Sequence, residues 1–201
     1  VTLATMALAR GLTLVYTGGR PILVDHRAYE FIGAGFLGPI PFPVVIMAVL
    51  YVVLHIILKH HKFGRLVYSI GGNEEACRLS GINVERIKVG IYTLSGLMAG
   101  LTGVVLTSRL ISAQPTAGTG YELDAIAAVI LGGTSLAGGQ GHIGGTIIGA
   151  FIIGVLSNGL NLLNVSPFYQ DVAKGIVILT AVLLDRLLYA TGGVQKGVVS
   201  S

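Results

Sequence analysis

The sequence predicts an all-α, polytopic transmembrane helix bundle, with a short helix outside the bilayer and one glycine-rich segment that is short or re-entrant. Hydrophobic residues make up 53% of the 201 residues, whereas Asp, Glu, Lys and Arg make up 11%, against about 25% in average soluble domains. The ranges 31–58, 89–108 and 125–170 contain none of these four residue types. As a helix, the last range would be about 69 Å long, which is enough to cross a bilayer core of about 30 Å twice.

The first half of the chain supplies three of the expected membrane segments. The first ends at Thr17-Gly-Gly-Arg-Pro21 and is short for a crossing, which predicts that an N-terminal portion is missing. A mixed stretch up to Pro43 is expected to be a loop. The second segment then runs to a basic exit at Lys59-His-His-Lys62, and the third follows the charged loop 59–88.

The second half supplies three more segments, all in the same membrane domain. The apolar run after Asp124 is broken by Gly132-Gly133 and Gly138-Gly139, so it either crosses steeply or re-enters. Irregular backbone at membrane depth needs cover from protein or from a water-filled cavity. Two longer apolar runs follow, and a short polar tail ends the chain. The six segments are expected at 1–16, 44–58, 89–108, 123–137, 143–163 and 172–188.

The basic residues predict the orientation of these segments. Loop 59–88 holds six of the thirteen Lys and Arg residues, whereas 17–43 holds two and Arg109 is alone in its loop. Cytoplasmic loops carry the excess of Lys and Arg, so loop 59–88 is predicted to be cytoplasmic. Alternating from there places 17–43 and 109–121 outside, 138–142 inside, and the C-terminus in the cytoplasm.

Several classes of chemistry find no support in the sequence. The lone Cys77 cannot form an intrachain disulfide, and no Cys/His cluster has the spacing of a metal site. Gly139-x-Gly141-x-x-Gly144 has the spacing of a dinucleotide loop, but it lacks a preceding strand and an acidic residue about 20 positions on. A tight turn between closely packed segments is the favoured interpretation. No catalytic constellation or Walker A loop is present either, so whatever energy drives this protein must come from elsewhere.

Small and polar residues inside the segments predict helix contacts. Gly96-x-x-x-Gly100 and Gly145-x-x-x-Gly149 each place two glycines on one helix face, where helices in lipid can approach closely. Asp171 and Lys174 are expected to form a local ion pair, because they are three residues apart on one helix. Asn158 and Asn161 either bridge helices or line a hydrophilic path, and the sequence favours neither.

The charged loop is expected to contain a short isolated helix over 73–81. Asn73 suits the N-cap, Glu74 and Glu75 suit the positive end of the helix dipole, and Gly81 can take the left-handed turn that ends the helix. Asn83 is then placed to cap the next membrane helix. Such a helix is either an amphipathic connector or a projection that a partner protein can grip.

These residues carry a family resemblance. Glu75-Ala76-Cys77-x-x-x-Gly81 resembles the EAA loop of ABC-importer permeases, with Cys77 in place of the usual second alanine. Residues 71–83, 112–128 and 131–139 resemble the permeases of ribose-type ABC sugar importers. The resemblance implies that the short helix is a cytoplasmic coupling helix that docks on an ATPase subunit. The docking residues would be Asn73, Glu74, Glu75, Ala76, Cys77 and Gly81.

The resemblance also implies the function and the partners. We expect a multi-pass permease subunit of the bacterial inner membrane that moves a monosaccharide, ribose or a related sugar. It would be no enzyme itself and would need no cofactor, metal or nucleic acid. It would work with an ABC ATPase and a periplasmic sugar-binding protein, and it would form a homodimer with a second permease subunit. The alternative is a stand-alone facilitator or channel without an ATPase.

A path for an uncharged sugar should offer hydrogen-bond partners and few full charges. The polar residues of the fourth and fifth segments meet this requirement, although a role in helix capping and packing is equally compatible with the sequence. The candidate path residues are Asp124, Thr134, Ser135, Asn158 and Asn161.

Overall fold

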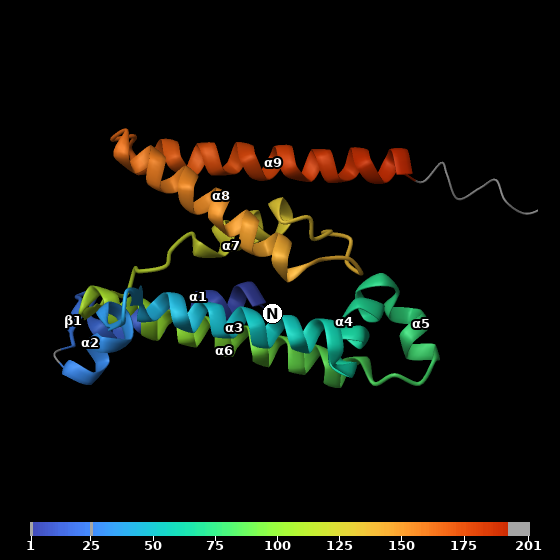
Figure 1. Ribbon diagram of the computed structural model, residues 1–201, viewed down its shortest axis with the longest axis horizontal. Coiled ribbons are helices and arrows are strands. Elements are labelled where there is room, and N and C mark those ends of the chain that lie inside the picture. The colour runs from blue at the N-terminus through green and yellow to red at the C-terminus, as the bar shows by residue number, and fades with distance from the viewer. Residues whose placement is uncertain (1, 25, 193–201) are drawn as a thin grey trace, which may run out of the picture. The chain divides into compact units, whose positions relative to one another are not determined.

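The computed structural model describes residues 2–24 and 26–192, and their side chains apart from those of 28 and 184–192. Helices dominate the described chain, which confirms the predicted all-α class (Figure 1). The chain forms two compact units. Unit 1 combines 1–57 with 83–119, and unit 2 combines 58–82 with 120–201.

Unit 1 contains three long apolar helices. α1 spans Thr2–Thr17, α3 spans Phe42–His60 and ends in unit 2, and α6 spans Val84–Leu110. Asn83 caps α6 as predicted, because its Oδ1 accepts a hydrogen bond of 3.1 Å from the backbone N–H of Arg86. α3 and α6 extend the predicted segments 44–58 and 89–108 by a few residues at their ends.

The prediction of a plain loop over 17–43 is wrong, because this stretch contains the helix α2 (Arg27–Ala34) and three short strands. β1 (Ile22–Leu23) pairs with β4 (Ser112–Ala113), and β2 (Phe36–Leu37) pairs with β3 (Ile40–Pro41). α2 packs on the end of α6, where the Ser108 hydroxyl donates to the Tyr29 carbonyl. α2 has eight residues, which is too short a window for helical periodicity to be recognised in the sequence.

Unit 2 contains the described helices of the charged loop and of the C-terminal half. The loop holds α4 (Lys62–Gly72), which the sequence did not predict, and α5 (Glu74–Leu79), which it did. α7 (Tyr121–Leu131), α8 (Ile143–Leu162) and α9 (Pro167–Gly192) follow. Ala127, Ala128 and Ile153 form their buried core, with Leu131, Val177 and Ile178 packed against it.

α7 and α8 pack backbone against backbone. A Cβ atom added at Gly149 would clash with the carbonyl oxygen of Ala128, and one added at Gly145 would clash with that of Gly132. The predicted close packing through Gly145 and Gly149 is therefore confirmed. By contrast, a Cβ at Gly96 or Gly100 would meet nothing within 4 Å in the described structure.

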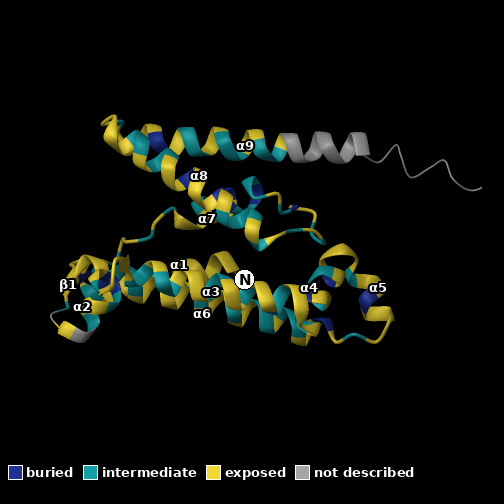
Figure 2. Cartoon of the chain, viewed as in Figure 1, coloured by how far each residue is buried: buried dark blue, intermediate teal, exposed yellow. Residues whose placement is uncertain are grey.

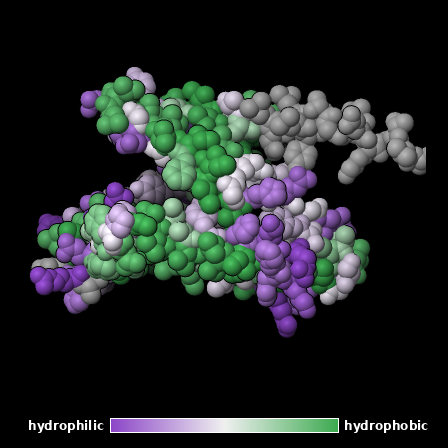
Figure 3. All heavy atoms as spheres, viewed as in Figure 1, coloured by the Kyte–Doolittle hydropathy of each residue, from purple (hydrophilic) through white to green (hydrophobic). Residues whose placement is uncertain are grey.

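Three of the described helices, α3, α6 and α8, are long and apolar enough to cross a membrane. Many of their large apolar residues are exposed, and few of their residues are buried (Figure 2). On the visible face, hydrophobic residues cover much of the helical surface (Figure 3). A protein surface of this kind is stable against lipid or further helices, because exposing it to water would cost free energy in proportion to its area. The crossings predicted for 1–16, 123–137 and 172–188 stay predictions.

Candidate functional site

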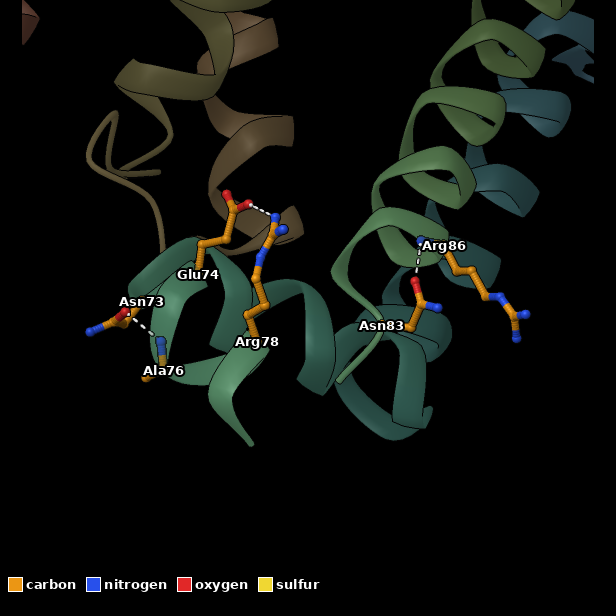
Figure 4. A network of polar contacts seen from close by, with 6 residues as sticks. All are labelled: Asn73, Glu74, Ala76, Arg78, Asn83 and Arg86. Carbon is orange, nitrogen blue, oxygen red and sulfur yellow. Dashed lines mark hydrogen bonds and ion pairs between the residues drawn. The ribbon is translucent and has the colours of Figure 1, made fainter. Parts of the chain in front are cut away.

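The short helix α5 is closed at both ends by its own residues. Asn73 is its N-cap, and the Asn73 Oδ1 accepts a hydrogen bond of 2.9 Å from the Ala76 N–H (Figure 4). At the other end, the Ile82 N–H donates to the Cys77 carbonyl at 3.1 Å, and Gly81 takes a left-handed φ of +79°. Both predicted caps are confirmed. They satisfy backbone groups that a helix this short could not otherwise pair.

The side chains of α5 divide into an inward and an outward set. Cys77 is buried, whereas Glu75 and Ala76 are exposed. Leu79 is 84% exposed, like many other large apolar residues of this chain. Arg78 Nη2 lies 3.1 Å from Glu74 Oε1, and both side chains are largely accessible to solvent, so this pair adds little stability (Figure 4). The outward set thus combines charged side chains with the apolar Leu79.

The loop 132–142, between α7 and α8, contacts the end of α4. The Tyr68 hydroxyl donates to the Gly141 carbonyl at 2.9 Å. Gly71 meets the backbone of Gly138 and Gly139 so closely that an added Cβ would lie 2.7 Å from the Gly139 nitrogen. The glycine-rich stretch therefore follows a helix and serves close packing. This supports the tight-turn interpretation of Gly139-x-Gly141-x-x-Gly144 over a dinucleotide loop.

An ion pair joins α7 to α9. Lys174 Nζ lies 2.9 Å from Asp124 Oδ1 and 3.0 Å from Asp124 Oδ2, and both side chains are about four-fifths buried, with 19% and 24% exposed. The prediction that Lys174 pairs with Asp171 is wrong. Helix periodicity placed Asp171 within reach, but the packing of α9 on α7 offers Lys174 a carboxylate that is shielded from solvent. Pairing offsets the cost of placing either charge in an apolar layer.

The two asparagines of α8 have different surroundings. Asn161 Oδ1 accepts a hydrogen bond of 2.9 Å from Gln170 Nε2, and Gln170 is buried at the start of α9. Gln170 also donates to the Val165 carbonyl at 2.9 Å, so the pair fixes the turn between α8 and α9. Asn158 is exposed. The structure therefore gives Asn161 a bridging contact and leaves Asn158 facing outward.

Thr134 and Ser135 lie in loop 132–142, at the other end of α8. Ser135 is buried, and its Oγ accepts a hydrogen bond of 3.2 Å from the Ala137 N–H. The Thr134 side chain lies against Gly141, next to the start of α8. Asn158 is about 22 Å further along that helix at 1.5 Å per residue. The five candidate path residues thus form separate groups and no single cluster.

The chain belongs to the family described as the permease component of the branched-chain amino acid transport system, whose model matches residues 1–182. Within that class, the chain is similar to the ribose import permease protein RbsC of Bacillus subtilis (strain 168), with 60% identity over 92% of this chain and 58% of that protein. RbsC of Escherichia coli (strain K12) is 54% identical over 92% of this chain and 59% of its own length.

The L-arabinose transport system permease protein AraH of Escherichia coli (strain K12) is 40% identical over 92% of this chain and 56% of its own length. The chain therefore spans a little under three fifths of the curated relatives it matches. No solved structure matches the chain.

Sequence reasoning missed the structural roles of two residues and gave a third the wrong partner. Lys174 was assigned to the wrong carboxylate, and Tyr68 and Gly71 were not considered. The glycine pair Gly71-Gly72 at a helix end was a signal of close approach, but the approaching segment is distant in sequence. Tyr68 gave no signal at all, because its partner is a backbone carbonyl.

Proposed function

We propose that this chain forms part of the membrane permease of an ATP-driven ABC importer that moves a monosaccharide, ribose or a related sugar, across the bacterial inner membrane. The observation that carries the proposal is α5, a short helix capped at both ends in the most basic loop of the chain. The proposal is supported by 54% to 60% identity to proteins named ribose import permeases.

In this function α5 is the coupling helix that docks on the ATPase subunit. Glu74, Glu75 and Ala76 form its first turn, and Cys77 anchors it from the buried side. Asn73 and Gly81 hold its ends. The ATPase hydrolyses ATP, a periplasmic sugar-binding protein delivers the sugar, and a second copy of the permease completes a homodimer. The chain itself supplies no catalytic group.

The proposed orientation places loop 59–88 and the C-terminus in the cytoplasm. The excess of Lys and Arg in that loop supports it. The contacts of Tyr68 and Gly71 with loop 132–142 support one part of this topology, namely that loop 132–142 lies on the same side of the membrane as loop 59–88. The chain between the outer stretch 109–121 and loop 132–142 then enters the membrane as the short helix α7, which ends at its C-cap Gly132. Discontinuous helices of this kind commonly form substrate sites in transporters.

The sugar path is proposed to use the polar residues of this crossing and of α8. Asp124, neutralised by Lys174, offers carboxylate oxygens without a net charge. Asn158 and Asn161 offer amides along α8. The hydroxyls of Thr134 and Ser135 lie near the proposed cytoplasmic end of the path. Hydrogen-bond partners of this kind can replace the water that a sugar loses on entering the membrane.

The test uses the full-length permease that contains this chain, reconstituted in liposomes with its ATPase and its binding protein. We expect uptake of ribose, or of a related sugar such as arabinose, that requires both partners and ATP. Leucine serves as the control substrate, because the family description refers to branched-chain amino acids.

The outcomes separate the candidate functions. Sugar uptake by the permease alone, unchanged by ATPase and ATP, would identify a stand-alone facilitator. ATP-dependent uptake of leucine in place of sugar would keep the importer class and refute the proposed substrate.

A further inference from the structure

The end of α4 and loop 132–142 form a contact in which no additional atom fits. A Cβ atom added at Gly71 would lie 2.7 Å from the Gly139 nitrogen, and one added at Gly138 would clash with the Gly71 carbonyl oxygen. Tyr68 lies three residues before Gly71, on the same face of α4, and its hydroxyl is bonded to Gly141 at 2.9 Å. Two adjacent turns of α4 therefore contact the same loop, one by packing and one by a hydrogen bond.

α5 is joined to this contact by a single residue. Asn73 ends α4, where its N–H donates to the Ser69 carbonyl at 3.0 Å, and it begins α5, where its side chain accepts from Ala76 at 2.9 Å. With both its backbone and its side chain fixed, Asn73 leaves little freedom for α5 to move without α4. A force applied to α5 therefore reaches Gly71.

Loop 132–142 is in turn fixed to the helices on either side of it. The Ser135 N–H donates to the Gln140 carbonyl at 3.1 Å, which closes the loop. At its base, Gly132 packs directly on Gly145 at the start of α8. A displacement of the loop therefore displaces the ends of α7 and α8 together, because close-packed elements shift as units.

We propose that the contact of Tyr68 and Gly71 with loop 132–142 is the link that transmits movement of α5 to α7 and α8 during transport. Tyr68 and Gly71 act as positioning residues, since they hold the loop to the coupling element and touch no substrate. The inference rests on the proposed function, in which an ATPase moves α5. It goes beyond that function by assigning the transmission to a specific contact between backbone segments.

The chain offers a matched pair of variants for the test. Gly71→Ala inserts a methyl group into the contact, whereas at Gly72 an added Cβ meets nothing within 4 Å. In the full-length complex, Gly71→Ala should lower the sugar transported per ATP hydrolysed by about two- to thirtyfold, the range typical of residues that carry coupling. Gly72→Ala should match the wild type. The amount of assembled complex and the ATPase rate without sugar should be unchanged in both.

A milder variant guards against misfolding of Gly71→Ala. Tyr68→Phe removes only the hydroxyl that binds Gly141, and Tyr92→Phe, on the exposed face of α6, is its control. The link is supported if Tyr68→Phe lowers the amount of sugar transported per ATP and Tyr92→Phe does not. The link would be overturned if the wild-type complex imports sugar and the amount of sugar transported per ATP is the same in the two tyrosine variants and the same in the two glycine variants.

A second measurement follows the loop directly and needs no transport. Leu136 is exposed in loop 132–142, so Leu136→Cys reports the loop's accessibility to a thiol reagent, after the labelling of the protein with only the buried Cys77 is subtracted. In the permease–ATPase complex, ATP should change the labelling rate of Leu136→Cys when it is combined with Gly72→Ala. When Leu136→Cys is combined with Gly71→Ala, ATP should leave the labelling rate unchanged. The same ATP response in both would refute the link, whether or not the complex imports sugar. Failure of the wild type to import sugar bears only on the proposed function.

Discussion

Lys174 on α9 holds both carboxylate oxygens of Asp124 on α7, at 2.9 and 3.0 Å, although Asp171 lies three residues away on its own helix. The pair is about four-fifths buried, and it ties the short α7 to the long α9. A pair in such surroundings mainly specifies which helices meet, because the cost of desolvating the two charges offsets much of their attraction.

Breaking this pair should destabilise the permease. We expect Asp124→Asn to lower the free energy of unfolding by about 1–3 kcal/mol, since it leaves Lys174 charged in apolar surroundings. Asp171→Asn, on the exposed side of α9, is the control and should change it by less than about 0.5 kcal/mol. Denaturant titration of the full-length protein in detergent measures both. A double variant with Lys174→Met should cost less than the sum of the single variants, and strict additivity would show that the two charges do not interact.

The close approach of α7 and α8 predicts a contrast between two glycines of α8. Gly149→Ala should destabilise by about 1–3 kcal/mol, because its methyl group would force α8 away from the Ala128 carbonyl. Gly154→Ala should be neutral or stabilise by up to about 1 kcal/mol, since its Cβ meets nothing within 4 Å. Thermal unfolding of the two variants side by side is the measurement. Equal midpoints would contradict the observed packing.

The N-cap of α5 predicts a functional effect that is larger than its effect on stability. Asn73→Ala removes the hydrogen bond to the Ala76 N–H and should cost about 1 kcal/mol, mostly as fraying of α5. Sugar-stimulated ATP hydrolysis should fall severalfold in the complex, and Asn73→Asp should restore it, because Asp caps equally well. Glu75→Lys should also reduce it, by reversing a charge at the docking surface. Full stimulation in Asn73→Ala and Glu75→Lys would reduce α5 to a connector.

The orientation predicts which sites a reagent outside the cell can reach. With the buried Cys77 kept, and its labelling measured in the parent protein, cysteines introduced singly at Ser69 or Asn83 should react with an impermeant thiol reagent only after the membrane is opened. A cysteine at Thr119 should react in intact cells. All three positions are exposed, so accessibility reports the side of the membrane. Labelling of Ser69→Cys in sealed cells would invert the topology.

The path proposal predicts that uptake and assembly respond differently to near-isosteric changes. Thr134→Val and Asn158→Leu each remove hydrogen-bonding groups and keep the side-chain size roughly constant. Each should slow sugar uptake more than it lowers the amount of assembled complex. Because the two residues lie at opposite ends of α8, their effects should be independent. Uptake that falls only in proportion to assembled protein would make these residues structural.

Local signals made several features of the fold predictable. The caps of α5 and α6 follow from Asn73, Gly81 and Asn83, since a cap depends on residues within one turn. The helix packing at Gly145 and Gly149 follows from a four-residue spacing on one face. Helix α2, in contrast, lies in a short mixed stretch, and its contact with Ser108 of α6 is distant in sequence.

The sequence by itself determined that this protein is a helical membrane protein, which of its loops is basic, and where the short helix α5 begins and ends. Composition and periodicity are sufficient for this, because the bilayer imposes its length and polarity on every segment. The tertiary structure alone decided that Lys174 pairs with Asp124, and that Tyr68 and Gly71 hold loop 132–142. These partners are tens of residues apart, and a residue's own neighbours carry no information about which distant backbone will pack against it.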